Sequence, residues 1–243
     1  MAKRTIDILL EDEDLIAVNK PAGLLTVPGR NGGVSLREVI GSAAGVKDFL
    51  LLVHRLDRQT SGVLLLAKHS DAQRALQKQF QERTVHKEYL AIVRGQPVED
   101  RGRIEVLMAP HSRVTGKMVV KQHKGKHSIT EWEVAERFAG ATLLRCHPLT
   151  GRQHQIRVHL AHIGLPLLVD PLYGGAEAFF LSQLKPDYRP SSRHEERPLI
   201  QRLTLHAHVL AFSHPRNGRP IRIEAPVPKD FRATVEQLRK TAR

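Results

Sequence analysis

The chain has 243 residues, of which 41% are hydrophobic and 26% are charged. These values fit one globular domain over residues 1–243, and no apolar run approaches the roughly 20 residues that a membrane-spanning helix needs. The opening residues also lack the apolar core of a signal peptide, so we expect a soluble, cytoplasmic protein. The single cysteine, Cys146, excludes an internal disulfide framework, and its apolar surroundings predict that it is buried.

The formal net charge of +13 indicates a polyanionic partner. Charge alone does not distinguish RNA from DNA or from an anionic membrane. The one continuous basic-rich stretch runs from residue 117 to residue 126, where lysines alternate with valine and glycine. We interpret it as a strand-and-loop surface that contacts phosphate, with a merely solvated face as the alternative.

In the first third of the chain, short apolar segments predict strands at residues 6–9, 15–18 and 63–67. The last of these is continuously apolar, as expected of a strand buried on both faces. Residues 20–23 contain proline and glycine and predict a turn. From Ser70 onward, apolar residues follow helical spacing, with Ser70 as the expected N-cap.

In the middle of the chain, alternation of apolar and polar residues predicts strands at 89–93, 131–134 and 142–146. A helix follows, with Arg152 at its start and Arg157 one turn inside, and glycine and proline end it at 164–166. The last predicted elements are strands at 203–212 and 221–224 and a closing helix around 231–238.

Short strands with a few helices and no regular βαβ alternation predict an α+β fold. We expect a mixed, largely antiparallel central sheet flanked by helices. Residues 185–198 are rich in proline, arginine and glutamate, which predicts an exposed insertion loop.

The first polar motif, residues 54–62, reads HRLDRQTSG and lies between two apolar segments. Asp57 is flanked by Arg55 and Arg58, whose charges favour an ionised carboxylate of the kind a nucleophile requires. Thr60 and the residues that follow it can fix such a turn. A surface turn with an internal ion pair would show the same charge pattern.

The second motif, residues 149–159, reads LTGRQHQIRVH and leads into the predicted helix. Arginines at a helix start can hold a phosphate or a buried carboxylate. The histidines at 154, 159 and 162 raise the alternative of a zinc site, but no acidic or cysteine ligand motif accompanies them.

The third motif, residues 87–95, reads KEYLAIVRG and carries Tyr89, one of three tyrosines. This side chain can stack on a base and offer a hydroxyl, although a half-buried strand tyrosine has the same pattern.

These three segments, in this order, resemble the RluA family of pseudouridine synthases. The resemblance spans about residues 6–228 and implies the pseudouridine-synthase fold, as a catalytic domain without the small N-terminal RNA-binding domain of many relatives. Pro171 departs from the family pattern, which often has a polar or basic residue there. Three shorter segments also match, at 18–23, 170–174 and 205–207.

The resemblance implies that the enzyme isomerises uridine in structured ribosomal or transfer RNA after base flipping. Asp57 is then the nucleophile or base that starts glycosidic cleavage, and Arg157 is the basic residue that pairs with it. Tyr89 packs against the uracil, and Arg55 fills the gap that the flipped nucleotide leaves. The remaining expected substrate-binding residues are Arg58, Thr60, Arg152, His154, Gln155 and Ile156.

The implied reaction involves no redox change or phosphoryl transfer, so we expect no cofactor and no metal, and a monomer. One alternative is a non-catalytic RNA-binding or assembly protein that keeps the fold, and another is a metal hydrolase that uses the histidines. A reactive carboxylate in a basic cleft favours the enzyme, since a binder does not need one. The target uridine and the identity of the attacked atom are not encoded in these motifs.

Overall fold

The computed structural model describes residues 6–27, 35–36, 39–40, 50–185, 188 and 195–241. They fall into two compact units, each built from two separate stretches of chain. The first unit comprises the described parts of Met1–Glu88 together with His206–Pro226, and the second comprises those of Tyr89–Leu205 and Val227–Arg243. The single domain over 1–243 stays a prediction. Most of the loop predicted at 185–198 lies outside the described residues.

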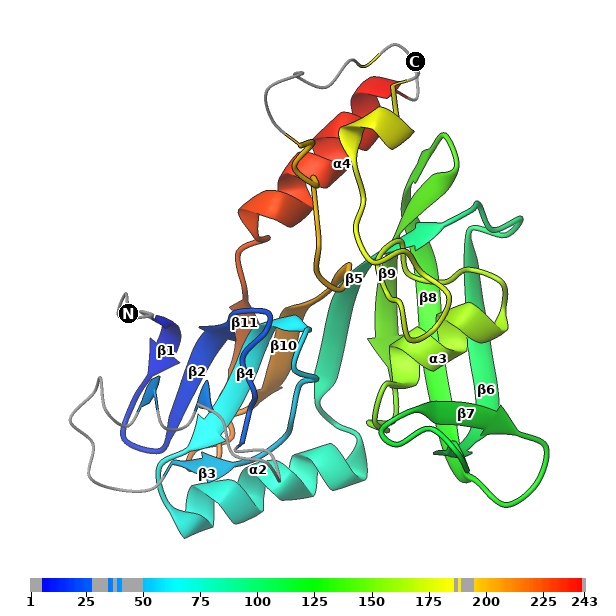
Figure 1. Cartoon of the computed structure of the whole chain (residues 1–243). Helices are drawn as coiled ribbons and strands as arrows, with labels where there is room; N and C mark the ends of the chain where they lie inside the picture. Colours follow the sequence, from blue (N-terminus) through cyan, green and yellow to red (C-terminus); the bar gives the residue numbers. More distant parts are fainter. Residues whose placement is uncertain are drawn as a thin grey trace. The chain divides into compact units, whose positions relative to one another are not determined.

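The first unit is a mixed sheet with one helix (Figure 1). Its helix is α2 (Ser70–Glu82). Its strands are β1 (Asp7–Glu11), β2 (Leu15–Lys20), β3 (Leu51–Leu52), β4 (Ser61–Ala67), β10 (Leu205–Ser213) and β11 (Pro220–Glu224). The strand β4 pairs with β2 along one edge, while β10 and β3 share the other edge. The β4–β10 pair is parallel and the other pairs of this unit are antiparallel.

Strand β4 is buried along its whole length, as its apolar sequence predicts. Alternate residues of β2 and β4 point to the core that α2 covers, where Ala72 and Leu76 of the helix contact them. This packing fixes the end of β4 at which the 54–62 motif enters the sheet.

The second unit contains an antiparallel sheet in the order β5-β9-β8-β6-β7. Its strands are β5 (His86–Arg94, which begins in the first unit), β6 (Arg101–Pro110), β7 (Met118–Lys121), β8 (Lys126–Phe138) and β9 (Ala141–Pro148). Its helices are α3 (Gln155–His162), the short 3-10 helix η1 (Leu181–Gln183) and α4 (Lys229–Thr241).

Two helices of this unit pack against opposite sides of β5. Ala91 and Val93 of β5 pack in one cluster with Ile156 and Leu160 of α3. Their neighbours in sequence, Leu90 and Ile92, pack in another cluster, to which α4 contributes Phe231, Val235 and Leu238. The alternation predicted for β5 therefore divides its side chains between two helices.

The α+β class and the largely antiparallel pairing are confirmed, with eleven strands and three α-helices among the described residues. None of those helices has the length and apolar character required to cross a membrane. Strand β6 was not predicted, because charged residues interrupt its apolar pattern, and β7 was predicted only as part of the strand-and-loop surface at 117–126.

Two predicted helix starts are wrong. Helix α2 is capped by His69, whose Nδ1 accepts the N–H of Ala72 at 3.3 Å, and not by Ser70. Helix α3 begins at Gln155, so Arg152 lies in the preceding turn. His154 has φ of 56°, a left-handed conformation that an α-helix cannot contain.

Candidate active site

The loop that carries Asp57 is held by a buried lysine of the preceding turn. Lys20 has no solvent exposure, and its Nζ donates to the carbonyl oxygens of Leu24 at 2.8 Å and of Pro21 and Arg58 at 3.0 Å. The N–H of Gly23 donates to the same Arg58 oxygen at 2.8 Å. A buried ammonium group needs such acceptors. Lys20 therefore connects the 20–24 turn to Arg58, the residue that follows Asp57.

Asp57 itself begins a tight turn, because its carbonyl oxygen accepts the N–H of Thr60 at 3.1 Å. Thr60 is buried, and the hydroxyl of Thr26 donates to the Leu56 carbonyl at 3.0 Å. Hydrogen bonds to the carbonyl oxygens of Leu56 and Asp57 therefore fix the backbone on both sides of the Asp57 side chain. Asp57 itself stays partly exposed. This arrangement suits a carboxylate that must be both accessible and oriented.

The loop enters β4 through Gly62, whose φ is 117°. A Cβ atom there would lie 2.0 Å from the Ala207 carbonyl oxygen of β10, so only glycine fits the parallel contact. The neighbouring Ser61 hydroxyl contacts Nδ1 of His206 at 2.9 Å, and both side chains are buried. The end of the motif is thus fixed to two strands.

His54 anchors the beginning of the motif. Its Nε2 accepts the N–H of Leu65 at 3.0 Å, and its ring stacks on Phe80 of α2 with centroids 4.8 Å apart. Burial, together with the positive charge of Lys87, lowers the pKa of His54 to about 3. The imidazole is therefore neutral at physiological pH, as an acceptor at Nε2 requires.

The two arginines beside Asp57 differ in their surroundings. Arg55 is exposed. Arg58 is also exposed, and its Nε donates to the Gly23 carbonyl at 3.1 Å, so it adds a second tie to the 20–24 turn. Substrate contact by Arg55, Arg58 or Thr60 stays a prediction.

In the second unit, Arg157 of α3 forms a buried, bidentate ion pair with Asp170. Its Nε and Nη2 lie 2.8 Å from Oδ2 and Oδ1 of that carboxylate. Asp170 has no solvent exposure and also accepts the N–H of Leu172 at 3.2 Å. Two parallel hydrogen bonds fix the plane of the guanidinium group. The pairing of Arg157 with Asp57, which belongs to the other unit, stays a prediction.

Tyr173 supports this arginine. Its ring centre lies 4.9 Å from Cζ of Arg157, within the range of a cation–π contact. Its hydroxyl accepts the N–H of Met118 at 2.8 Å and lies 2.8 Å from Nδ1 of His154. The tyrosine therefore joins β7, the α3 start and the Arg157–Asp170 pair.

Tyr89 lies near the start of β5, opposite Cys146 of β9. It is half-buried and packs against the cluster that contains Ile156. The half-buried strand position matches the alternative that the sequence left open, and contact with uracil stays a prediction. Cys146 is fully buried, as predicted, and burial raises the pKa of its thiol.

The other residues of the 149–159 motif have distinct surroundings. Gln155 is buried, where Nε2 donates to Ile129 O at 2.8 Å and Oε1 accepts from Thr150 and from the Arg152 N–H. Ile156 lies in the core. Arg152 is partly exposed, with Nε donating to His127 O at 3.2 Å. Gln155 and Ile156 thus shape the turn, and their contact with substrate stays a prediction.

Comparison with known proteins shows the family to which the chain belongs. A model of the family described as RNA pseudouridylate synthase matches residues 14–162, more than half of the chain. The chain belongs to the RNA pseudouridylate synthase family. The expected resemblance and the expected enzyme class, an isomerase, are confirmed.

Among curated relatives of this pseudouridylate synthase, the ribosomal large subunit pseudouridine synthase C of Salmonella typhi is 40% identical over 236 residues. The match covers 97% of this chain and 70% of the relative. The protein of the same name from Escherichia coli K12 is also 40% identical, over 233 residues, with 96% and 70% covered.

Solved structures of two human proteins share the fold. RNA Pseudouridylate Synthase Domain Containing 1 has a TM-score of 0.71 and 28% identity, covering 94% of this chain and 86% of that one. RNA Pseudouridylate Synthase Domain Containing 4 has a TM-score of 0.72 and 25% identity, with 96% and 93% covered.

The zinc hypothesis for the histidines of α3 finds no support in this synthase. His159 is buried with Nε2 at 2.9 Å from the Ser128 hydroxyl, whereas His162 is exposed. Burial, with the charge of His162, lowers the pKa of His159 to about 4. Among the described residues, only Asp12, Asp14 and His214 bring three potential metal-ligand atoms close together.

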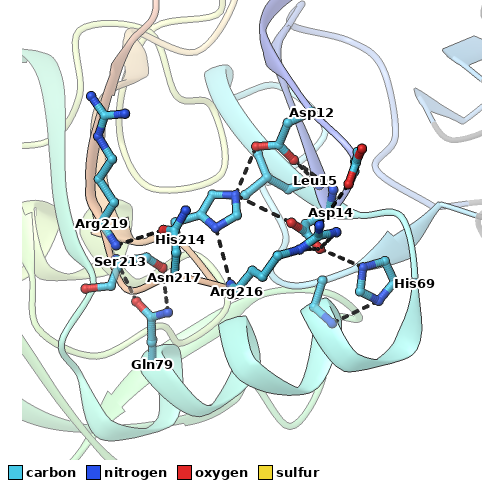
Figure 2. A network of polar contacts seen from close by, with 12 residues as sticks. Asp12, Asp14, Leu15, His69, Gln79, Ser213, His214, Arg216, Asn217 and Arg219 are labelled. Atoms are coloured by element: carbon cyan, nitrogen blue, oxygen red, sulfur yellow. Dashed lines mark hydrogen bonds and ion pairs between the residues drawn. The ribbon is translucent and has the colours of Figure 1, made fainter.

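Figure 2 shows that these three side chains already have other partners. Arg216 binds the Asp14 carboxylate at 2.9 Å, and His69 contacts the same oxygen at 2.9 Å. His214 lies 3.1 Å from Asp12. Burial by itself would raise the pKa of Asp14, but the hydrogen bonds from Arg216 and His69 outweigh it and lower the pKa. The cluster therefore ties the β1–β2 turn to the β10–β11 turn.

Sequence reasoning assigned no role to Lys20, Asp170 or Tyr173. All three belong to segments that the resemblance singled out, at 18–23 and 170–174. A lysine in a Pro-Gly turn and an acid near the second motif are weak signals, because neither pattern reveals which distant group it contacts.

Proposed function

We propose that this protein isomerises uridine to pseudouridine in ribosomal RNA of the large subunit, with Asp57 as the essential carboxylate. The observation that carries the proposal is the Asp57 turn, fixed by Lys20 and Gly62, in a chain that belongs to the synthase family. The names of the relatives support the choice of RNA.

The reaction breaks the bond between N1 of uracil and C1′ of ribose and forms a bond between C5 and C1′. A proton leaves C5 and one is gained at N1, so atoms balance without a co-reactant. Asp57 starts the cleavage as nucleophile or base, and Arg157, oriented by Asp170, carries the compensating charge. Tyr89 packs against the detached uracil. RNA is the partner, and a cytoplasmic monomer remains part of the proposal.

The test is tritium release from RNA transcribed with uridine labelled at C5. We expect wild-type protein to release tritium from large-subunit ribosomal RNA, and Asp57→Asn to lower the rate by at least about a thousandfold. Asp71→Asn, which removes an exposed carboxylate of α2 paired with Arg74, is the matched control and should retain the wild-type rate.

Other outcomes have distinct meanings. Release from transfer RNA alone would reject the ribosomal target while keeping the reaction. Release by Asp57→Asn at the wild-type rate would remove Asp57 from the chemistry. Absence of release from every unmodified RNA, with binding retained, would indicate a non-catalytic RNA-binding protein.

A further inference from the structure

A groove in the second unit lies outside the residues assigned to the chemical steps, although Arg152, one of the expected substrate-binding residues, borders it. It is bordered by the end of β6, the start of β7, the β7–β8 turn and the residues before α3. Its volume is about 620 Å³, within the range of roughly 300–1,000 Å³ that small-molecule sites occupy. The groove is therefore large enough for a nucleotide-sized ligand.

The walls of the groove carry positive charge without negative charge. Lys124, Lys126 and Arg152 line it, and no aspartate or glutamate is among its lining residues. Within the described part of the chain, none of these three cations forms an ion pair, whereas Arg103 and Arg239 on the same unit are paired with glutamates. Unpaired cations grouped around one groove favour an anionic ligand.

Packing restrains the turn that carries Lys124, and a hydrogen bond restrains the side chain of Arg152. Lys124 has φ of 59°, and a Cβ atom on Gly125 would lie 2.9 Å from Cβ of Leu107. The turn therefore packs tightly on β6. Arg152 is fixed by the hydrogen bond from its Nε to the His127 carbonyl. The Arg152 guanidinium has therefore already lost part of its conformational freedom on folding, which lowers the entropic cost of binding a ligand there.

The groove also has an apolar part, formed by Met108, Met118 and Pro110. Met108 is almost completely buried, and Met118 and Pro110 retain exposure. Thioether groups make favourable contacts with aromatic rings, and unstacked bases of RNA present such rings. An apolar surface beside unpaired cations matches a base with its phosphates better than it matches a free inorganic anion.

One hydrogen bond joins the groove to the residues around Arg157. The backbone N–H of Met118 donates to the Tyr173 hydroxyl at 2.8 Å, and the Tyr173 ring packs on Arg157. A ligand in the groove would therefore lie one residue away from the group that supports the proposed catalytic arginine.

We propose that this groove binds an unpaired nucleotide of the RNA substrate other than the target uridine, with the base on Met118 and Pro110 and the phosphates on the cations. This inference rests on the proposed function, because it takes RNA as the substrate. The groove would select RNAs whose unpaired region supplies a second exposed base.

The test measures binding of the full chain to a short single-stranded oligoribonucleotide and to an abasic analogue of the same length. We expect wild-type protein to bind the base-containing strand several times more tightly. Met118→Ala should abolish most of this preference, since it removes the thioether and keeps the backbone N–H. The double variant Lys126→Gln/Arg152→Gln should weaken binding of both strands by about tenfold or more.

The matched control is Arg101→Gln/Lys240→Gln, which removes the same charge from two exposed positions of the same unit outside the groove. It should weaken binding less than about twofold, and circular dichroism should show that all variants are folded. If the two double variants weaken binding equally, the groove cations contribute no more than other positive charges on the surface. That result would overturn the inference. A preference for the base-containing strand that survives Met118→Ala would overturn it as well.

Tritium release separates this inference from the proposed function. If wild-type protein and Asp57→Asn behave as proposed but the groove variants keep the wild-type KM on large-subunit RNA, only the inference fails. If wild-type protein releases no tritium from any RNA, the proposed function fails, whatever the oligonucleotides bind.

Discussion

Buried charges hold two turns of this enzyme, at residues 20–24 and 170–173, in fixed conformations. Lys20 donates three hydrogen bonds to carbonyl oxygens around the Asp57 loop, and Asp170 accepts two from Arg157. A buried charge is tolerated only with partners of this kind, and removal of one partner leaves the other uncompensated. The hydrogen bonds of these buried side chains therefore help to stabilise the loops that carry the site.

At the residue scale, Arg157→Lys should lower both activity and stability. Lysine keeps the charge but loses the planar fork that binds both oxygens of Asp170, so the free energy of unfolding should fall by roughly 1–3 kcal/mol. The rate of tritium release should fall by about a hundredfold or more, because the guanidinium orientation is lost. Urea unfolding and initial rates measure the two effects.

The control for this prediction is Arg239→Lys, which alters an exposed bidentate pair with Glu136. Exposed pairs contribute little, so its unfolding free energy should change by less than about 0.5 kcal/mol. If Arg157→Lys kept the wild-type activity, the bidentate contact with Asp170 would not be needed for the reaction.

His54 gives a second prediction at this scale, on pH dependence. Its pKa is about 3 in the folded protein, below the ordinary 6.5, so the unfolded chain binds the extra proton first as pH falls. The contribution of neutral His54 to stability is therefore present above pH 6.5 and is lost as pH falls toward 3, by at most about 1.4 kcal/mol per pH unit.

Urea unfolding at pH 7, 6 and 5 measures this slope in a window where most carboxylates stay ionised. His54→Gln should flatten the slope, and His159, whose pKa is about 4, should account for part of what remains. The control His123→Gln alters an exposed histidine and should keep the wild-type slope. An unchanged slope in His54→Gln would show that His54 is not buried in the neutral form.

At the scale of elements, the parallel contact between β4 and β10 depends on one glycine. Gly62→Ala should lower the free energy of unfolding by more than about 3 kcal/mol, because the new Cβ would clash with backbone and φ is positive. Gly140→Ala in the β8–β9 turn has a similar φ of 74° but open space around it, and should cost about 1 kcal/mol.

Thermal and urea unfolding of these two variants separate backbone strain from steric overlap. Comparable losses in both would mean that the close approach of β10 contributes nothing beyond the positive φ. The comparison thus tests the strand pairing that delivers the Asp57 loop to the sheet.

At the scale of the whole molecule, the net charge of +13 should govern RNA affinity. Each phosphate contact releases counterions, so the affinity for large-subunit RNA should fall on the order of a thousandfold between 50 and 200 mM salt. Filter binding or fluorescence anisotropy at several salt concentrations measures the slope. A Kd independent of salt would contradict a phosphate-contacting surface.

The family, the α+β class and most of the strands could be predicted from the amino-acid sequence alone. The motif at 54–62 and the buried strand after it are contiguous, and contiguous patterns of hydrophobicity and polarity are readable without a structure. The alternation at 89–93 likewise predicted the strand β5, whose packing against two helices is known from the structure.

Contacts between side chains that are far apart in the sequence could be identified only from the three-dimensional structure. The resemblance implied Asp57 as partner of Arg157, which stays a prediction, and the sequence did not indicate the ion pair with Asp170, because periodicity carries no information about contacts between separate turns. The helix start at Gln155 also depends on a left-handed His154 that packs on Tyr173. The cationic groove joins segments around residues 108, 125 and 152, which the pairing of β6 with β8 and the hydrogen bond from Arg152 to His127 bring together.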